Sequence, residues 1–198
     1  MIICASDDTK TRIMKSTILL FNKYGPMVSM SKISEGAGVA AGTPFKYFST
    51  KDELLWATYY YARTSVEGTK RENPLAQTTT EDMIKAIVTD ILRWAAICPE
   101  EHEYVEKYED SVCYDYFSED FSKLYEGIVD ELKIWDRMKD DVRKDIPMEV
   151  ISRIISVHCS VFARYMSHRG MDIDTPETTA LMRASADSIW NSIKRQLG

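Results

Sequence analysis

Residues 11–56 read TRIMKSTILLFNKYGPMVSMSKISEGAGVAAGTPFKYFSTKDELLW and decide the fold of the first part of this 198-residue chain. The first part of this stretch has apolar residues at helical spacing. Phe21 and Tyr24 lie on one apolar stripe, and the basic residues lie on other faces. The Gly-Pro pair that follows Tyr24 cannot continue a helix. We therefore expect a first helix at about residues 8–24, buried along its apolar stripe.

Three further helices are expected in the same stretch. Ser29 is a good N-cap for a short helix at about residues 30–37, and a second short helix follows at about residues 40–48. The run at residues 49–53, STKDE, has an acid three residues after a hydroxyl, which predicts a capped helix that continues past Tyr61. Two short helices joined by a glycine-containing turn form a helix–turn–helix, whose second helix enters the major groove of DNA.

Charge is distributed unevenly along the chain, although its formal total is -6. Residues 9–51 contain seven lysines and arginines against one glutamate, whereas residues 73–198 contain 15 basic and 24 acidic side chains. A basic segment attached to an acidic body is typical of a module that binds a polyanion. Charge alone is also compatible with a solvated basic face on an ordinary helical bundle.

Residues 11–56 closely resemble the N-terminal DNA-binding module of TetR-type transcriptional regulators. Four short motifs, in order and at the expected spacing, carry the resemblance. They are Leu20-Phe21…Tyr24-Gly25, Ile33…Ala37-Gly38-Val39, Gly42-Thr43…Phe45-Lys46-Tyr47-Phe48 and Lys51-Asp52-Glu53-Leu54-Leu55. Each motif is weak by itself, but the combination is specific.

The resemblance implies an all-α homodimer in which a three-helix helix–turn–helix head precedes a larger helical bundle. We place the DNA-binding domain at residues 1–52 and the effector-binding and dimerisation domain at residues 53–198. In such regulators the body usually binds a small molecule, and binding changes the spacing of the two heads. The resemblance thus implies a ligand-responsive repressor that leaves its operator when the effector binds.

Candidate DNA contacts are transferred from the family pattern residue by residue. The pattern places the start of the second helix near the DNA backbone and the next short helix in the groove. It also places one lysine at the N-terminus of the fourth helix, where the helix dipole favours phosphate. The implied residues are Ser29, Ser31, Lys32, Ala41, Gly42, Thr43, Phe45, Lys46, Tyr47 and Lys51.

Three residues depart from the family pattern. Ala40 stands where a capping serine or threonine is common, Pro44 where a large apolar residue is usual, and Phe45 where tyrosine is common. Proline is tolerated near the start of a helix, but one turn later it would kink the helix at a cost of about 3 kcal/mol. Base readout would then depend on Thr43, Lys46 and Tyr47.

The remainder of the chain also has helical periodicity. We expect helices at about residues 81–97, 100–113, 118–138, 147–168 and 178–197. Helix 147–168 is apolar on more than one face, and helix 178–197 is rich in small residues that allow close packing. Together with the resemblance, this predicts a homodimer through the last two helices. Alternatively, both helices close the core of one protomer.

The middle of the body is rich in aromatic residues, which together with methionines can enclose an apolar pocket for a small-molecule effector. For each ring the alternative is a plain core or surface position. The many acids at residues 100–120 are interpreted as a solvated face, with a cationic ligand as the alternative. The residues predicted to line the pocket are Trp94, Tyr108, Phe121, Tyr125, His158 and Phe162.

Several classes of protein are disfavoured by motifs that the sequence lacks. The four cysteines form no C-x-x-C pair, which predicts free thiols in a reducing cytoplasm. The three histidines have no metal-like spacing, so neither a metal nor another cofactor is expected. No apolar run is long enough to span a membrane, and the N-terminus does not resemble a signal peptide. No catalytic motif favours an enzyme.

The leading hypothesis from the sequence is a cytoplasmic, dimeric, ligand-responsive regulator that represses transcription by binding double-stranded operator DNA. A second hypothesis, motivated by the three departures, is a helical protein of the same fold that acts through protein partners and has degenerate DNA binding. A third is an enzyme with its active site in the aromatic body. It would turn over a bound metabolite rather than bind it reversibly.

Overall fold

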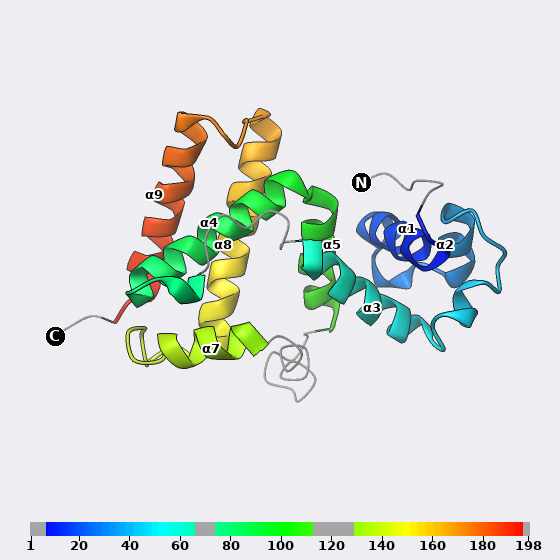
Figure 1. Cartoon of the computed structure of the whole chain (residues 1–198), viewed down its shortest axis with the longest axis horizontal. Coiled ribbons are helices and arrows are strands. Elements are labelled where there is room, and N and C mark those ends of the chain that lie inside the picture. The colour runs from blue at the N-terminus through cyan, green and yellow to red at the C-terminus, as the bar shows by residue number, and fades with distance from the viewer. Residues whose placement is uncertain (1–6, 66–73, 113–128, 196–198) are drawn as a thin grey trace. The chain divides into compact units, whose positions relative to one another are not determined.

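The computed structural model describes residues 7–65, 74–112 and 129–195 (Figure 1). Within these ranges the regular elements are helices, and one isolated bridge joins Val142 to Lys194. The prediction of an all-α chain is confirmed. None of the described helices combines the length and the apolar character that crossing a membrane requires.

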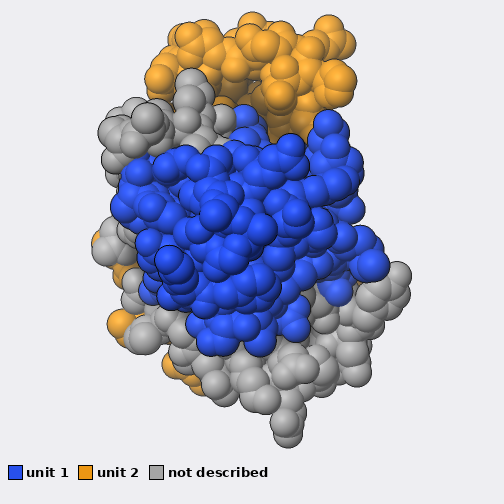
Figure 2. All heavy atoms as spheres, turned by 90° about the vertical axis from the view of Figure 1, so that its right-hand side faces the viewer, with its two compact units in different colours: residues 1–68, 98–112 blue, residues 69–97, 113–198 orange. Residues whose placement is uncertain are grey.

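The chain folds into two compact units, which Figure 2 colours separately. Unit 1 comprises residues 1–68 and 98–112, and unit 2 comprises residues 69–97 and 113–198. Two helices that lie largely or wholly beyond residue 52 therefore pack with the N-terminal part. These packing units do not coincide with the predicted functional boundary between residues 52 and 53, which stays a prediction.

The described residues of unit 1 form six helical elements, and local signals set their boundaries. The Ser29 hydroxyl accepts the N–H of Lys32 at 3.3 Å, and the Thr50 hydroxyl accepts the N–H of Glu53 at 3.1 Å, as N-caps do. The predicted first, second and fourth helices are confirmed. The elements are α1 (Thr9–Tyr24), η1 (Gly25–Met27), α2 (Met30–Gly36), η2 (Pro44–Lys46), α3 (Lys51–Thr64) and α5 (Pro99–Val112).

The prediction of a regular helix at residues 40–48 is wrong. A turn occupies its first part, and only Pro44–Lys46 are helical, in the short 3-10 helix η2. Pro44 has no N–H to donate to the carbonyl of Ala40, and that carbonyl accepts the N–H of Thr43 at 2.8 Å instead. The Thr43 carbonyl in turn accepts the N–H of Lys46 at 3.0 Å. The proline thus tightens the segment into i→i+3 turns.

Aromatic rings form the centre of unit 1. Phe21 of α1 meets Tyr104 of α5 edge to face, with ring centroids 5.0 Å apart, and Tyr59 of α3 lies 5.2 Å from Tyr108 of α5. The Tyr104 hydroxyl donates to the carbonyl of Leu55 at 2.9 Å, so its polar atom is satisfied inside the core. These rings join α1, α3 and α5. Buried aliphatic residues beside them include Ile13, Ile18, Ile33 and Leu54.

Unit 2 is built around α4, which packs against both α8 and α9, while α8 and α9 also contact each other. Four of the five helices predicted after residue 80 are confirmed within a few residues, one of them as α5 of unit 1. Of the predicted helix 118–138, the last part is α7, and residues 118–128 lie outside the described residues. In the part of unit 2 that the structure describes, the elements are η4 (Pro74–Ala76), α4 (Thr80–Ile97), α7 (Val129–Met138), α8 (Met148–Arg169) and α9 (Pro176–Ile193).

The core of unit 2 consists mainly of aliphatic and sulphur-containing side chains. Polar contacts supplement it: the Thr80 hydroxyl donates to the Asp141 carboxylate at 2.5 Å, and buried Arg93 pairs with exposed Asp174 at 3.0 Å. The core residues include Met83, Ile84, Val88, Leu92, Met138, Ile151, Cys159, Met166, Met182 and Ile189.

Candidate nucleic-acid interface

The turn after α2 is fixed by side chains of α1. The Arg12 guanidinium donates from Nη2 to the carbonyl oxygens of Ala37 at 2.6 Å and Gly38 at 3.2 Å. Gly38 has a φ of 65°, a conformation that disfavours a side chain, and a Cβ there would lie 2.8 Å from Nη2 of Arg12. The turn therefore requires a glycine, and its backbone is held against α1.

Residues 40–47, named the recognition segment from here on, follow that turn. Pro44 within the segment and Phe48 directly after it are buried, so they anchor it to unit 1. Between these anchors Phe45, Lys46 and Tyr47 are exposed, with 56% of Phe45 and 42% of Tyr47 accessible. Ala41 and Gly42 are exposed, and Thr43 is half-buried. The structure brings these predicted DNA contacts together on one short stretch of backbone.

The start of α2 presents the predicted backbone contacts. Ser29 is the N-cap, while Ser31 and Lys32 are exposed. The Lys32 ammonium lies 4.4 Å from the centre of the Tyr24 ring, and the Lys23 ammonium lies 5.1 Å from the same ring. The ammonium groups of Lys23 and Lys32 therefore both interact with the Tyr24 ring, near the end of α1 and the start of α2.

Tyr24 is exposed, contrary to the expectation from the sequence. We predicted it on the buried stripe of the first helix, but 45% of its surface is exposed. The reason is its position as the last residue of α1, where the chain turns at Gly25, with a φ of 69°, and the apolar stripe has no further partner. Its place directly after Lys23 and directly before a glycine is the signal that could have identified it.

Lys51 differs from the other candidate DNA contacts because its ammonium has a protein partner. It donates to the carbonyl of Pro26, and the side chain is half-buried at the start of α3. This bond ties α3 to η1. A DNA contact by Lys51 stays a prediction, and its ammonium is positioned by the protein in advance.

Four further lysines of the basic stretch at residues 9–51 are exposed cations. Lys10, Lys23, Lys32 and Lys46 are exposed and form no ion pair within residues 7–65, 74–112 and 129–195. Lys15, by contrast, pairs with Asp7 at 2.9 Å. Exposed, unneutralised lysines attract polyanions over distances comparable to the Debye length.

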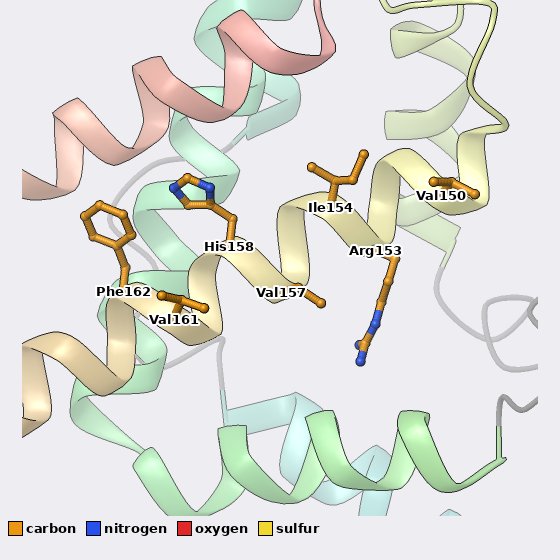
Figure 3. A pocket seen from close by; sticks show the side chains of 7 residues that line it. All are labelled: Val150, Arg153, Ile154, Val157, His158, Val161 and Phe162. Carbon is orange, nitrogen blue, oxygen red and sulfur yellow. The ribbon is translucent and has the colours of Figure 1, made fainter.

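Two of the predicted ligand-binding residues lie together on α8. The rings of His158 and Phe162 stack with centroids 5.1 Å apart and planes inclined by 8°. Both line a cavity of about 510 Å³ (Figure 3). The other described lining residues carry no signal in the sequence, because most of them look like ordinary positions of an apolar helix. They are Val150, Arg153, Ile154, Val157 and Val161.

His158 brings a polar group into this apolar wall. Its Nε2 is buried and has no hydrogen-bond partner among the described residues. Burial lowers the pKa of His158 below its usual 6.5, because a charged imidazolium would lose solvation there. A neutral ring with one unused nitrogen can accept or donate a hydrogen bond to a ligand.

The other predicted ligand contacts are spread over the chain. Trp94 is buried on α4 of unit 2, whereas Tyr108 belongs to the ring cluster in the core of unit 1. Phe121 and Tyr125 lie outside the described residues. The described part of the chain therefore unites only His158 and Phe162, and ligand binding by any of the six stays a prediction.

Comparison with family models gives one match. Residues 13–58 match the model described as bacterial regulatory proteins, tetR family. The matched range runs from α1 through α2 and the recognition segment into α3. It contains the Arg12-held turn, the exposed recognition segment and Lys51.

Solved structures similar to this chain cover nearly its whole length. A TetR family transcription regulator from Marinobacter aquaeolei VT8 superposes with a TM-score of 0.73 at 17% identity, over 95% of this chain and 96% of that one. A putative tetR family transcription regulator from Shewanella sp. PV-4 gives 0.71 at 16% identity, over 96% and 100%. A ketosteroid transcriptional regulator from Mycobacterium tuberculosis gives 0.60 at 10% identity, over 98% and 100%. At these identities the likeness concerns the fold.

Proposed function

From the premise that this chain is a transcription regulator of the tetR family, to which residues 13–58 assign it, we propose that it is a cytoplasmic, homodimeric repressor. It binds operator DNA through residues 1–52 and is released by a small molecule held in residues 53–198. The observation that carries the proposal is the exposed recognition segment, held between two buried anchors, in a stretch of chain where Lys10, Lys23, Lys32 and Lys46 are exposed.

The DNA-binding surface has separate parts for phosphates and bases. Ser29, Ser31 and Lys32 at the start of α2 and Lys51 at the start of α3 bind phosphates, because hydroxyls, ammonium groups and helix N-termini all favour anions. The recognition segment enters the major groove and meets base edges with Ala41, Gly42, Thr43, Phe45, Lys46 and Tyr47.

Dimerisation through α8 and α9 places two heads on successive major grooves, about 34–36 Å apart or a multiple of that distance. On α9, Ala180, Ala184 and Ser188 recur every fourth residue and are exposed, which gives a flat stripe for a second helix. On α8, Val161 and Tyr165 are exposed apolar residues of the same spacing. Replacing Ala184 by Arg is expected to shift the protein from dimer to monomer in sedimentation velocity, and an unchanged dimer would contradict this interface.

The effector occupies the cavity on α8. Its described walls are aliphatic and aromatic, with the Arg153 guanidinium and the His158 imidazole as polar groups. This composition favours a mostly apolar molecule with a polar or anionic group. Val161 lines the cavity and also belongs to the exposed stripe of α8, so a ligand there would act on the helix that forms the dimer.

The second hypothesis retains a specific observation in its favour. Pro44 reduces the expected helix 40–48 to a turn and a 3-10 helix, so the segment offers fewer regularly spaced side chains than an α-helix. A protein that acts only through protein partners would bind DNA weakly, and loss of Lys46 or Lys32 would change that binding little.

DNA binding is tested by selecting duplexes from a random 30-base-pair library with the full-length protein. Lys46→Ala and Lys32→Ala are then compared at several salt concentrations, with Lys144→Ala in unit 2 as control. We expect each of the first two to weaken binding and lower the salt slope by about one, because one released counterion is lost. The control should leave both unchanged. Failure to enrich any sequence would overturn the proposal.

Effector binding is tested by a thermal-shift screen of small molecules, followed by DNA-release assays on each compound that stabilises the protein. Phe162→Ala should reduce the thermal shift of a true effector, because its ring forms part of the cavity wall. Exposed Tyr60→Ala in unit 1 is the control. A compound that stabilises both variants equally and leaves DNA bound is not an effector of this site. Turnover of a stabilising compound would instead favour the enzyme hypothesis.

A further inference from the structure

The recognition segment has a chemistry that restricts what it can recognise. Its exposed residues before η2 are Ala40, Ala41 and Gly42, which offer at most a methyl group to a partner. A Cβ added at Gly42 would meet no atom within 4 Å, so another molecule can approach the backbone closely there. Hydrogen-bonding side chains are confined to half-buried Thr43 and to the two residues after Phe45.

Phe45 is the most conspicuous side chain of the segment. It lies between buried Pro44 and exposed Lys46, and 56% of its surface is accessible. Its backbone position is restrained on both sides, because the carbonyl of Pro44 accepts the N–H groups of Tyr47 and Phe48, both at 3.0 Å. The ring therefore projects from a fixed backbone into solvent. An exposed apolar ring gains stability wherever a partner covers it with apolar surface.

In the major groove of B-DNA, the groups on the base edges determine which apolar partner is available to the ring. Each base pair presents hydrogen-bond donors and acceptors there, and the C5-methyl group of thymine is the apolar group among them. A phenylalanine ring cannot replace the hydrogen bonds that water makes to the polar base edges, so covering those edges would be unfavourable. The thymine methyl has no such bonds to lose.

We propose that Phe45 is a specificity-determining residue that reads thymine through its C5-methyl group. The inference rests on the proposed DNA binding and specifies what the operator must contain: a thymine in each half-site where Phe45 enters the groove. Lys46, as a point charge, bonds guanine or phosphate at the neighbouring position. Phe45 therefore supplies an apolar component of readout beside the polar contact from Lys46.

The test uses duplexes enriched from the random library, resynthesised with deoxyuridine in place of one thymine at a time. Uracil forms the same base pair and lacks only the C5-methyl group. We expect about fourfold weaker binding at one position in each half-site, which corresponds to one buried methyl-sized group. Positions outside the contact should respond by less than twofold.

Phe45 variants identify the residue responsible. In Phe45→Ala, deoxyuridine at the sensitive position should cause no further loss, because the two changes remove the same contact. Phe45→Leu should restore part of the sensitivity, since leucine still covers a methyl group. Tyr47→Phe is the matched control, and it should retain the full response to deoxyuridine. Because Phe45 is exposed, these variants should keep the melting temperature of the parent protein.

The outcomes separate this inference from the proposed function. If a sequence is enriched but every deoxyuridine duplex binds equally well, thymine reading is wrong and DNA binding stands. If Phe45→Ala remains as sensitive to deoxyuridine as the parent protein, another residue reads the methyl group and the assignment to Phe45 is wrong. If no sequence is enriched, both the inference and the proposed function are overturned.

Discussion

The two compact units of this chain differ in the contacts that predominate between their elements: side-chain bonds to distant carbonyls occur in both, in unit 2 from Arg137 to Leu75 and Gln77, but more described side chains make them in unit 1. In unit 1, polar side chains bond to backbone carbonyls of other elements, and aromatic rings pack between the helices. In unit 2, aliphatic and methionine side chains fill the space between α4, α8 and α9. The side chains that donate to distant carbonyls in unit 1 are Arg12, Ser16, Asn22, Lys51, Tyr104 and Lys107.

This difference matches the tasks proposed for the units. Directional hydrogen bonds fix one backbone relative to another, because their strength falls steeply with distance and angle. A surface that must meet the grooves of DNA benefits from such fixation. An aliphatic core with methionines is less directional and tolerates changes in shape. A unit that adapts to a small molecule benefits from that tolerance.

The largest expected effect comes from removing a ring from unit 1. Phe21 is fully buried and contacts the rings of Tyr104 and Tyr108, so Phe21→Ala should lower the free energy of unfolding by about 3–5 kcal/mol. Leu92→Met, a volume-conserving change at a fully buried position of unit 2, should cost less than about 1.5 kcal/mol. Urea denaturation measures both. If Leu92→Met lowered the free energy of unfolding by more than about 1.5 kcal/mol, the core of unit 2 would be less tolerant of changes in shape than described.

The next effect concerns the turn after α2. Gly38→Ala should destabilise unit 1 by about 1–2 kcal/mol, because alanine at a φ of 65° is strained and its Cβ would meet the Arg12 side chain. Gly42→Ala is the matched control. It has a free position for Cβ and no positive φ, so it should be close to neutral in thermal denaturation. Equal melting temperatures for the two variants would show that the turn is less rigidly held than proposed.

Helix caps should behave alike in both units, because they are local devices. The Thr50 hydroxyl of unit 1 and the Thr175 hydroxyl of unit 2 each accept an N–H three residues ahead, at 3.1 and 3.2 Å. Thr50→Ala and Thr175→Ala should each cost about 1 kcal/mol in urea denaturation. Exposed Thr64→Ala, which removes no N-cap, should change stability by less than about 0.5 kcal/mol. If only one of the two cap substitutions lowered stability, the units would differ in their helix ends as well as in their cores.

The smallest effect is a pH dependence of unit 2. Burial lowers the pKa of His158 below 6.5, so at mildly acidic pH the unfolded chain binds this proton more readily than the folded chain. The stability that His158 contributes is thus present above pH 6.5 and is lost as the pH falls through its lowered pKa. His158→Phe keeps a ring next to Phe162 and should flatten the fall in stability between pH 7 and pH 5. An unchanged slope would mean that other groups cause it.

Much of the fold followed from local patterns. Apolar spacing, the caps at Ser29 and Thr50, and the Gly-Pro break after α1 concern residues within a few positions of one another, and the corresponding helices lie close to where they were expected. The conformation of the recognition segment was harder to predict from the sequence. From the sequence, Pro44 is compatible with a helix start or with a kink in a helix. The hydrogen bonds donated by the N–H groups of Thr43 and Lys46 show that the segment forms tight turns instead.

The candidate site was predictable only in part, for a similar reason. Four motifs located the DNA-binding candidates, but exposure depends on which surfaces neighbours cover. Tyr24 is exposed because the chain turns away at the end of α1, and Tyr108 lies in the core of unit 1 because α5 packs against α1 and α3. The glycine after Tyr24 marks the end of its helix, whereas no sequence pattern reveals the neighbours of Tyr108.

The sequence by itself determined the helical class, the caps, the basic head on an acidic body and the order of the family motifs. These features depend on single residues or on short spacings. The tertiary structure alone decided that α5 joins unit 1, that Lys51 bonds the carbonyl of Pro26, and that Phe45 projects between buried anchors. The physical reason is that such contacts join residues brought together by packing, and helical periodicity specifies which face is buried but not its partner.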